Sequence, residues 1–291
     1  MIGRAFLAGV GALLLAACED TPPPPPVDNP LLWEIASADG QVEGWLYGTI
    51  HALPDGVEWQ TAAVRSVIDA ADFLVLEVAG LDDRAAIQQA FIDEARSVGH
   101  PPLADRVDPA RRAMLQELAG ETPYTASDYR QIETWAAALI LLQAIPTEAD
   151  SANGVDRALA LQFADRRIEE FEGAARQFAI FDGLAEEDQR VMLAAVVDQA
   201  ERRKKAADPV ALWLAGDERA LAAETSRGML ADPEIREALL GARNRDWALR
   251  IRALLEDPPR PLIAVGAAHM VGPDGLIALL EEQGFEVRRL R

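Results

Sequence analysis

Cysteine and basic residues are both scarce in this chain, and their scarcity excludes several classes of protein. The single cysteine, Cys18, cannot form an intramolecular disulfide, and a zinc site built from cysteines is excluded as well. Lysine and arginine together number 28 against 48 aspartates and glutamates, which gives a formal net charge of −20. Such a surface repels phosphate backbones and anionic headgroups, so we expect no nucleic-acid partner and no membrane binding by charge.

Long apolar runs are missing too. Two apolar runs stand out, residues 5–17 and 135–145, and both are shorter than the roughly 20 residues that a transmembrane helix needs. The second run is expected to be a core helix. Half of the 291 residues are apolar, so the chain can build one large core or two smaller ones.

The first apolar run has the features of a signal peptide. One basic residue, Arg4, precedes it, and it ends in Leu15-Ala16-Ala17-Cys18. Small residues before a cysteine at this place resemble the lipobox of bacterial lipoproteins, in which cleavage leaves the cysteine as the acylated N-terminus. The alternative is an ordinary signal peptide with an incidental cysteine. We favour a lipoprotein signal peptide over residues 1–17, because the only cysteine falls where lipidation requires one.

A proline-rich linker follows the cysteine. The five consecutive prolines Pro22 to Pro26 form an extended segment that cannot pack a core. Residues 18–30 are therefore expected to be the lipidated cysteine and a spacer, and residues 31–291 the folded domain. This organisation predicts a domain in the bacterial cell envelope, lipid-anchored and facing the periplasm.

Histidine is the third scarce residue, and two of the three histidines occupy the same slot of a repeat. Residues 46–56 and 264–275 both contain apolar residues, Gly-x-x-His, two more apolar residues and Pro-Asp-Gly, with one extra glycine in the second copy. The motif glycines, Gly48 and Gly266, permit a tight turn or a close approach of two backbones. One Gly-x-x-His is a weak pattern, but its duplication favours a functional site over a hydrogen-bonded turn.

Alternating strand and helix patterns follow both copies of the motif. The helix and strand ranges are 58–70 and 72–78 in the first unit, and 274–283 and 285–290 in the second. Residues 81–257 between the units are almost entirely helical in pattern, with a possible short strand at 168–171. We therefore predict an α/β fold in which two β-(GxxH)-α-β units share one central mixed sheet, with a large helical insertion at about 81–257.

Three candidate site residues fall near the carboxyl ends of predicted strands, where ligands bind in open α/β sheets. They are His51, His269 and Glu77, which lies in an otherwise apolar run. A buried carboxylate is costly unless it is paired or bound to a cation. Two imidazoles and a carboxylate are suitable donors for a divalent metal with open positions. The third histidine, His100, lies in a turn-like Gly-His-Pro-Pro segment, and we assign it no role.

These residues carry a resemblance to a known family. The segments Trp33-Glu34-Ile35, Tyr47 to Pro54, Leu76-Glu77-Val78 and Val265 to His269 resemble the TraB/GumN family. That family includes the Tiki metalloproteases and is related to the erythromycin-esterase/ChaN-like group, and the resemblance covers essentially residues 31–291. It implies an α/β core with a helical insertion, and a site made from both Gly-x-x-His motifs and the strand glutamate. Manganese or cobalt is the metal that the Tiki resemblance implies, and zinc suits the same donors.

Two further segments resemble family positions, Gly154-Val155-Asp156 and Arg243-Asn244. In a metal-dependent hydrolase the two motif histidines and Glu77 would be ligands, or Glu77 would be the general base instead. Arg243 or Asn244 would stabilise the developing oxyanion. Helix capping or surface pairing would explain Arg243 and Asn244 equally well.

Three functions remain open from the sequence. We predict a membrane-anchored metal-dependent hydrolase, peptidase-like, that acts on a peptide or small molecule with manganese, cobalt or zinc. A haem- or metal-binding lipoprotein without catalysis is the alternative, and a scaffold at the envelope is the third. A haem protein would show a Soret band on reconstitution, whereas a hydrolase would lose activity with a chelator.

Overall fold

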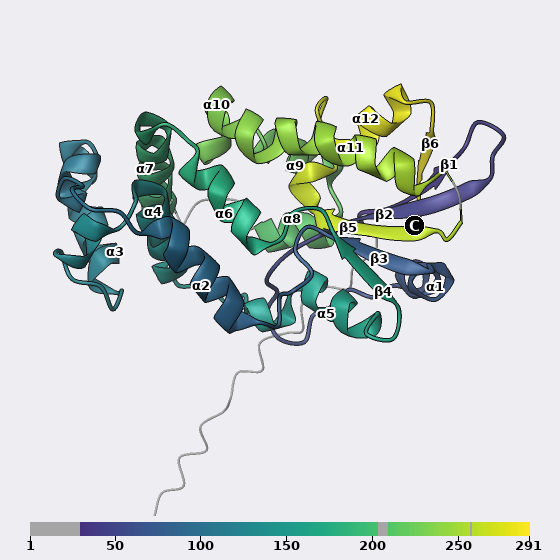
Figure 1. Cartoon of the computed structure of the whole chain (residues 1–291), viewed down its shortest axis with the longest axis horizontal. Coiled ribbons are helices and arrows are strands. Elements are labelled where there is room, and N and C mark those ends of the chain that lie inside the picture. The colour runs from purple at the N-terminus through teal and green to yellow at the C-terminus, as the bar shows by residue number, and fades with distance from the viewer. Residues whose placement is uncertain (1–29, 203–208, 257) are drawn as a thin grey trace, which may run out of the picture.

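A six-stranded sheet forms one half of the computed structural model, which describes residues 30–202, 209–256 and 258–291 (Figure 1). The strand order is β4-β3-β5-β2-β1-β6. The strands are β1 (Leu32–Ala36), β2 (Val42–Thr49), β3 (Phe73–Leu76), β4 (Arg167–Glu170), β5 (Pro261–Gly266) and β6 (Glu286–Arg289). The neighbours β4, β3, β5 and β2 are parallel, whereas β1 is antiparallel to both β2 and β6. The predicted α/β fold with a mixed sheet is therefore confirmed.

The two strands that end in Gly-x-x-His are direct neighbours in this sheet. β2 and β5 pair in parallel, with Gly48 opposite Val265 and Thr49 opposite Gly266. Because parallel strands present their carboxyl ends at the same edge of a sheet, the two motifs meet although more than 200 residues separate them.

The two repeat units are interleaved rather than side by side. The first unit is β2, α1 (Ala62–Ala70) and β3, and the second is β5, α12 (Leu276–Glu282) and β6. Within each unit the strands run in the same direction but are not neighbours: β5 lies between β2 and β3, and both β2 and β1 lie between β5 and β6. Helix α1 begins four residues later than predicted, because the Thr61 hydroxyl caps it by accepting a hydrogen bond from the amide of Val64 at 3.2 Å.

The insertion is helical, with one strand. The short run predicted near residues 168–171 forms β4, which extends the sheet beside β3. Its helices are α2 (Arg84–Ala95), α3 (Arg112–Gly120), α4 (Thr134–Ala144), α5 (Val155–Gln162), α6 (Ala174–Asp182), α7 (Glu186–Arg202), α8 (Pro209–Ala215), α9 (Glu218–Glu224), α10 (Pro233–Arg236) and α11 (Ala242–Leu254). Figure 1 shows α3, α4 and α7 at the end of the molecule away from the sheet, with α11 and α12 above the strands and α1 and α5 below them.

Two apolar clusters hold these parts together. One is built on the sheet and on α1, α5, α11 and α12, with Leu46, Leu74 and Ile263 completely or almost completely buried. The other lies inside the insertion around Trp135 and Leu193. The apolar run predicted as a core helix is thus α4, and it packs against α7. Among the described residues, no helix is long and apolar enough to cross a membrane.

The predicted signal peptide over residues 1–17, the anchor residue Cys18 and the linker up to residue 29 lie outside the described residues. Pro30 is described and buried, and the next residue, Leu31, is 1% exposed and belongs to the apolar cluster built on the sheet.

Candidate functional site

His51, Glu77 and His269 all lie just beyond the carboxyl ends of the three central strands. Strand β2 ends at Thr49, β3 at Leu76 and β5 at Gly266, so all three residues follow the ends of their strands, as expected. The predicted strand run 72–78 is shorter in the structure, and Glu77 comes directly after it. A Cβ built on Gly266 would lie 3.2 Å from Glu77 Oε1 and 3.9 Å from both His269 Cδ2 and His51 Nε2. The three side chains predicted to share a site therefore surround one point on the backbone of β5.

The two motif glycines lie at crowded positions. A Cβ on Gly48 would lie 3.2 Å from both Ala267 Cα and Leu31 Cβ. Gly266 faces the three site side chains in the same way, and its amide donates a hydrogen bond of 2.7 Å to Glu77 Oε1. In both copies glycine thus permits the close approach of groups from a neighbouring strand or loop.

The imidazole of His51 is oriented by Asp156. Nδ1 donates to Asp156 Oδ2 at 2.8 Å, and Thr49 Oγ1 donates to the other oxygen of the same carboxylate at 2.5 Å. This hydrogen bond raises the pKa of His51, against the effect of desolvation. The ring is 67% exposed while the carboxylate is 6% exposed. Because Nδ1 is committed to Asp156, Nε2 is the nitrogen left to face the crevice.

Backbone contacts explain how Asp156, from the distant helix α5, reaches His51. The amide of Val155 donates to the carbonyl of Ile50 at 3.0 Å, and Leu53 and Asp150 exchange two backbone hydrogen bonds. Gly154 allows this contact, because a Cβ there would lie only 2.5 Å from the His51 carbonyl oxygen. Asp156 was noted in the sequence only as part of a family-like segment. Its role depends on this tertiary contact.

The second imidazole, His269, is buried and held by Asn244. Asn244 donates through Nδ2 to the carbonyl of Asp274 at 2.7 Å, which turns Oδ1 toward His269 Nδ1 at 2.5 Å. Burial lowers the pKa of His269 to about 4, so the ring is neutral at physiological pH. A neutral ring with its proton on Nδ1 presents a lone pair on Nε2. The ring of Trp247 packs on it at 4.5 Å between centroids.

Glu77 is the negative charge of the site. It is 6% exposed, and its Oε2 accepts from Arg243 Nη2 at 3.0 Å while its Oε1 lies 3.8 Å from His269 Nε2. Burial works against the charged form, but His269, Arg243, His51 and the amide of Gly266 together lower the pKa of Glu77 to about 2. The carboxylate is therefore ionised throughout the physiological range.

Arg243 joins Glu77 to a second carboxylate, Glu172, that was not singled out in the sequence. The guanidinium donates through Nε and Nη2 to the two carboxylate oxygens of Glu172 at 2.9 and 2.8 Å. This contact is bidentate, and the Glu172 side chain is 2% exposed. Glu172 lies just after β4, and its amide donates to the carbonyl of Glu77 at 3.1 Å. A fourth strand end thus contributes to the site. The only local signal was an acidic residue following a short strand pattern.

The predicted catalytic residues therefore take different places. Arg243 lies in the site itself, with Nη1 3.2 Å from His269 Nε2. Asn244, the next residue on α11, contacts the far nitrogen of His269 and so orients that ring. The remaining histidine, His100, lies in the insertion, in contact with Glu133 and Ser97.

The donors suit a divalent metal in chemical type. Both histidines have Nδ1 bound by another side chain, which leaves Nε2 as the ligand atom, and metal-ligating histidines are held in this way. Glu77 adds an ionised carboxylate. The ligand atoms of these three residues do not all lie within 4.8 Å of one another, because among the described residues only those of His100, Glu133 and Glu186 do so.

A pocket of about 230 Å³ opens beside these residues. Its lining includes His51, Glu77 and Asp156 from the site, and Val78 and Leu81 as apolar wall. Arg157, which also lines it, is held by the carbonyl of Leu81 at 2.6 Å and by the carboxylate of Asp82. A substrate group in this pocket would contact His51 and Glu77 directly.

Comparison with protein-family models assigns the chain to a family. The model of the TraB/PrgY/gumN family matches residues 31–289, nearly the whole described domain. No curated protein and no solved structure matches the chain.

Proposed function

The chain belongs to the TraB/PrgY/gumN family, and from that premise we propose that it is a metal-dependent, peptidase-like hydrolase. One observation carries the proposal: His51, Glu77 and His269 surround a single point at the carboxyl ends of adjacent parallel strands. In addition, the Nδ1 atom of each histidine is committed to another side chain, so both rings offer Nε2.

His51, His269 and Glu77 would hold a manganese, cobalt or zinc ion. Such an ion supplies a bound water of lowered pKa and polarises the scissile carbonyl. The low pKa of Glu77, about 2, supports the ligand role over that of general base, because a carboxylate that is so weak a base is a better ligand than a proton acceptor. Asp156 and Asn244 bind Nδ1 of the two imidazoles, so Nε2 is the nitrogen of each that would ligate the metal. Because the bond to Asp156 raises the pKa of His51 to about 9, the metal would displace a proton from that ring.

Arg243 would act on negative charge that develops on a substrate through its positive charge rather than through a free N–H, because Glu172, Glu77, His269 and the carbonyl of Leu239 engage its nitrogens. Its Nη1 and Nη2 atoms contact His269 and Glu77, and its Nε and Nη2 atoms are fixed by Glu172. A guanidinium held in advance needs no reorganisation when an oxyanion forms. Asn244 has both ends of its amide engaged, by His269 and by the carbonyl of Asp274, so it acts through His269 rather than on the substrate.

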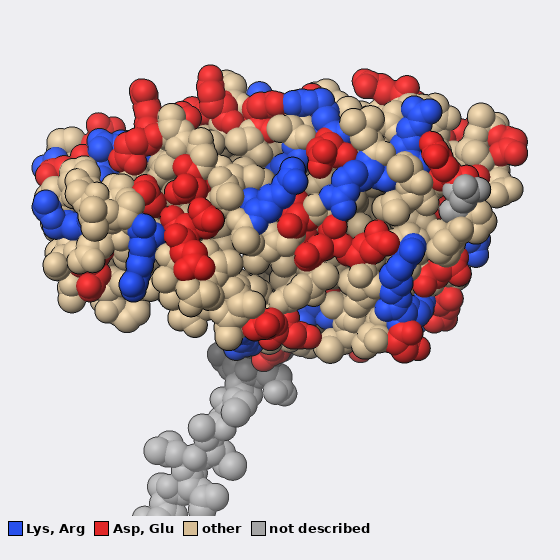
Figure 2. Space-filling model, in the orientation of Figure 1, with Lys and Arg blue, Asp and Glu red and all other residues tan. Residues whose placement is uncertain are grey.

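The proposed location is the bacterial cell envelope, with a lipid on Cys18 and the domain facing the periplasm. The lipobox-like segment and the proline-rich linker support it. Nucleic acid is not a proposed partner, because the net charge is −20 and Figure 2 shows basic side chains interspersed with acidic ones on the face in view.

Metal binding without catalysis is the second candidate. It is favoured by the engagement of all three Arg243 nitrogens by groups of this chain, which leaves no free N–H to bind a substrate oxyanion. In either function Arg243 Nη1, which lies 3.2 Å from His269 Nε2, must give up that lone pair to the metal. Haem is the less favoured ligand, because the pocket of about 230 Å³ is smaller than the roughly 300–1,000 Å³ typical of sites for organic ligands.

A cleavage assay separates these functions. The full-length chain is loaded with Mn²⁺, Co²⁺ or Zn²⁺ and incubated with a mixture of unmodified peptides, and the products are identified by mass spectrometry. We expect cleavage that a chelator abolishes and that His269→Ala and Glu77→Gln lack, while Glu117→Gln, an exposed change on α3, retains it. Tight metal binding without any cleavage would support the non-catalytic alternative.

A further inference from the structure

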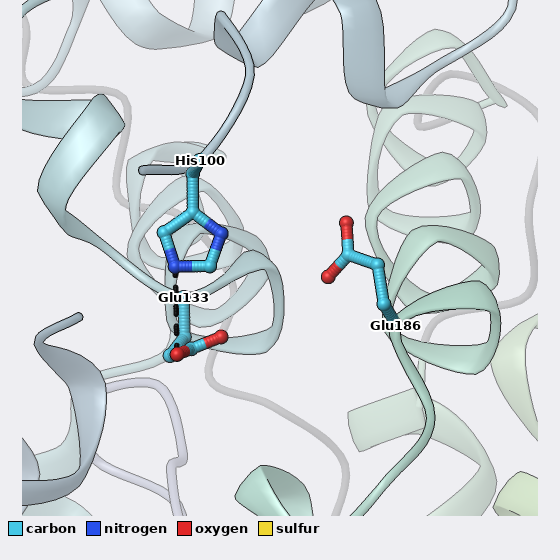
Figure 3. Close-up of side chains that lie close together, drawn as sticks. All are labelled: His100, Glu133 and Glu186. Atoms are coloured by element: carbon cyan, nitrogen blue, oxygen red, sulfur yellow. Dashed lines mark ion pairs between the residues drawn. The ribbon is translucent and has the colours of Figure 1, made fainter. Parts of the chain in front are cut away.

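A second group of potential metal ligands lies in the helical insertion, away from the sheet. It consists of His100, Glu133 and Glu186, and one ligand atom from each lies within 4.8 Å of the others. The three come from separate segments: His100 from the loop after α2, Glu133 from the residue before α4, and Glu186 from the start of α7. Figure 3 shows the three side chains converging, with Glu186 across a gap from the imidazole of His100 and the carboxylate of Glu133.

Each of the three side chains is held on one side and has a donor atom left on the other. Ser97 Oγ bridges His100 Nε2, at 2.5 Å, and Oε1 of Glu133. Oε1 of Glu186 accepts from Thr134 Oγ1 at 3.0 Å and from Arg190 Nε at 2.8 Å. No described residue donates to Oε2 of either glutamate or contacts Nδ1 of His100, and Figure 3 shows this nitrogen on the side of the ring toward Glu186.

Burial makes this arrangement unlike an ordinary surface cluster. The side chains of His100 and Glu133 are 15% and 18% exposed, and that of Glu186 is 43% exposed. Two carboxylates close together and partly desolvated repel each other unless a cation lies between them. Arg190 pairs with Oε1 of Glu186 at 2.8 Å. The guanidinium of the nearby Arg106 donates to the carbonyls of Pro101, Ile132 and Tyr129 and to the Thr134 hydroxyl, so among the described residues no cation contacts Oε2 of either glutamate.

We propose that His100, Glu133 and Glu186 form a zinc site. Zinc takes imidazole nitrogen and carboxylate oxygen at about 2.0–2.2 Å, so its ligand atoms lie roughly 3.3–3.6 Å apart in a tetrahedron. Because the ligand atoms now lie within 4.8 Å of one another, they must approach by at most about 1.2–1.5 Å, and the half-exposed Glu186 is the side chain that can move. The two carboxylates neutralise the ion, and water takes the fourth position.

A serine–histidine–glutamate catalytic triad is excluded by the geometry of the same residues. In a triad the serine and the carboxylate contact opposite nitrogens of the imidazole. Here Ser97 Oγ and Glu133 Oε1 both lie at Nε2 of His100, at 2.5 and 3.4 Å, and Ser97 gives its proton to Glu133. Ser97 therefore positions two ligands and is not a nucleophile.

The zinc ion would tie together three segments over the apolar cluster of the insertion. The ion would link the loop after α2 to the N-terminal ends of α4 and α7, with the open fourth position that three protein ligands leave. Ions that bind only the folded state raise its stability. This site does not depend on the proposed hydrolase function, and the two are tested by different substitutions.

The test measures zinc stoichiometry and affinity by competition with a chromophoric chelator, using full-length protein. In a His51→Ala/His269→Ala background, which removes the histidine ligands at the sheet, we expect one zinc ion per chain. Adding Glu186→Gln should weaken binding at least tenfold, whereas adding Glu187→Gln, the exposed neighbour on α7, should leave it unchanged. Equal affinity in the Glu186→Gln and Glu187→Gln variants would overturn the proposal.

Single substitutions in the otherwise unchanged chain repeat the test without relying on the double variant to fold. Glu186→Gln should lower the number of tightly bound zinc ions by one, and Zn²⁺ should raise its thermal unfolding midpoint less than that of the Glu187→Gln variant. The same zinc count and the same thermal shift in both variants would refute a site at Glu186. Loss of binding at the sheet is read separately, from His51→Ala/His269→Ala.

Discussion

Asp156 accepts a hydrogen bond of 2.8 Å from His51 Nδ1, although 105 positions separate the two residues. The carboxylate is also fixed by the Thr49 hydroxyl, which lies on the same strand as the motif that it supports. On the opposite side of the site, Asn244 does the same for His269 with an uncharged amide. The two histidines of the repeat therefore have chemically different partners. Their pKa values also differ, since that of His51 is raised and that of the buried His269 is lowered.

The first prediction concerns Asp156→Asn. Because the hydrogen bond to the carboxylate raises the pKa of His51, its loss should return that pKa toward the ordinary range. Affinity for Mn²⁺ should fall roughly 10- to 100-fold, as is typical when the partner of a ligating histidine is removed. The pKa is measured by NMR titration of the ring protons in the metal-free chain, and the affinity by calorimetry. Asp165→Asn, at a position with an 89% exposed side chain, is the matched control. An unchanged His51 pKa in Asp156→Asn would contradict the assignment.

The second prediction concerns stability against pH in the metal-free chain. The folded-state pKa of His269 is depressed from 6.5 to about 4, so the unfolded chain binds a proton at a higher pH than the folded chain does. The stability from the neutral ring is present above pH 6.5 and is lost as the pH falls toward 4. A shift of this size corresponds to on the order of 3 kcal/mol.

Urea unfolding at a series of pH values, with chelator present, measures this effect. The wild-type free energy of unfolding should decline between pH 6.5 and 4 more steeply than that of His269→Gln, which has no titrating ring at this position. Parallel curves for the two proteins across this window would show that His269 titrates alike in both states.

The third prediction concerns Gly266→Ala. The added methyl would lie 3.2 Å from Glu77 Oε1. The carboxylate must therefore move away from the Gly266 amide, whose hydrogen bond it accepts. Metal affinity should fall roughly tenfold, which is the lower end of the effect of disturbing the support of a ligand. Gly80→Ala is the control, because a Cβ there meets nothing within 4 Å. Calorimetric titration with Mn²⁺ compares the two, and equal affinities would show that Glu77 is not a ligand.

The fourth prediction concerns the anchor. Cys18→Ala removes the only thiol available for acylation, so the protein should leave the membrane fraction or remain unprocessed. Cell fractionation and the mass of the N-terminal peptide measure this. Ser37→Ala, in the folded domain, should fractionate like the wild type. An unchanged location and an unchanged N-terminal mass for Cys18→Ala would rule out lipidation at this residue.

The duplicated motif made the centre of the fold predictable. A strand pattern followed by Gly-x-x-His occurs twice, and parallel strands place such motifs at one edge, which is how β2 and β5 are arranged. The strand order within the sheet was not predictable, because local patterns carry no information about which strand lies between two others. The interleaving of β5 between β2 and β3 is therefore a property of the tertiary structure.

The residues of the site also differ in whether the sequence alone could identify them. His51, His269 and Glu77 could be found from the sequence, because scarce histidines and a carboxylate in an apolar strand are local anomalies. Glu172 and Asp156 could not be given roles, since acidic side chains are frequent in a chain with 48 of them. Only the packing of β4 and α5 against the central strands brings them to the site.

The position of β5 also sets the order in which the molecule can be completed. This strand lies between β3 and β2 in the sheet but is formed by residues 261–266. During synthesis nearly 200 residues are therefore added after β3 before the strand that joins β3 to β2 is made. Contacts between such distant segments form slowly, and unpaired strand edges are prone to aggregation. A nascent or truncated chain that lacks β5 also lacks His269 and the Gly266 amide. The candidate site is therefore incomplete until the last strands are made, and earlier intermediates expose the edges of β2 and β3.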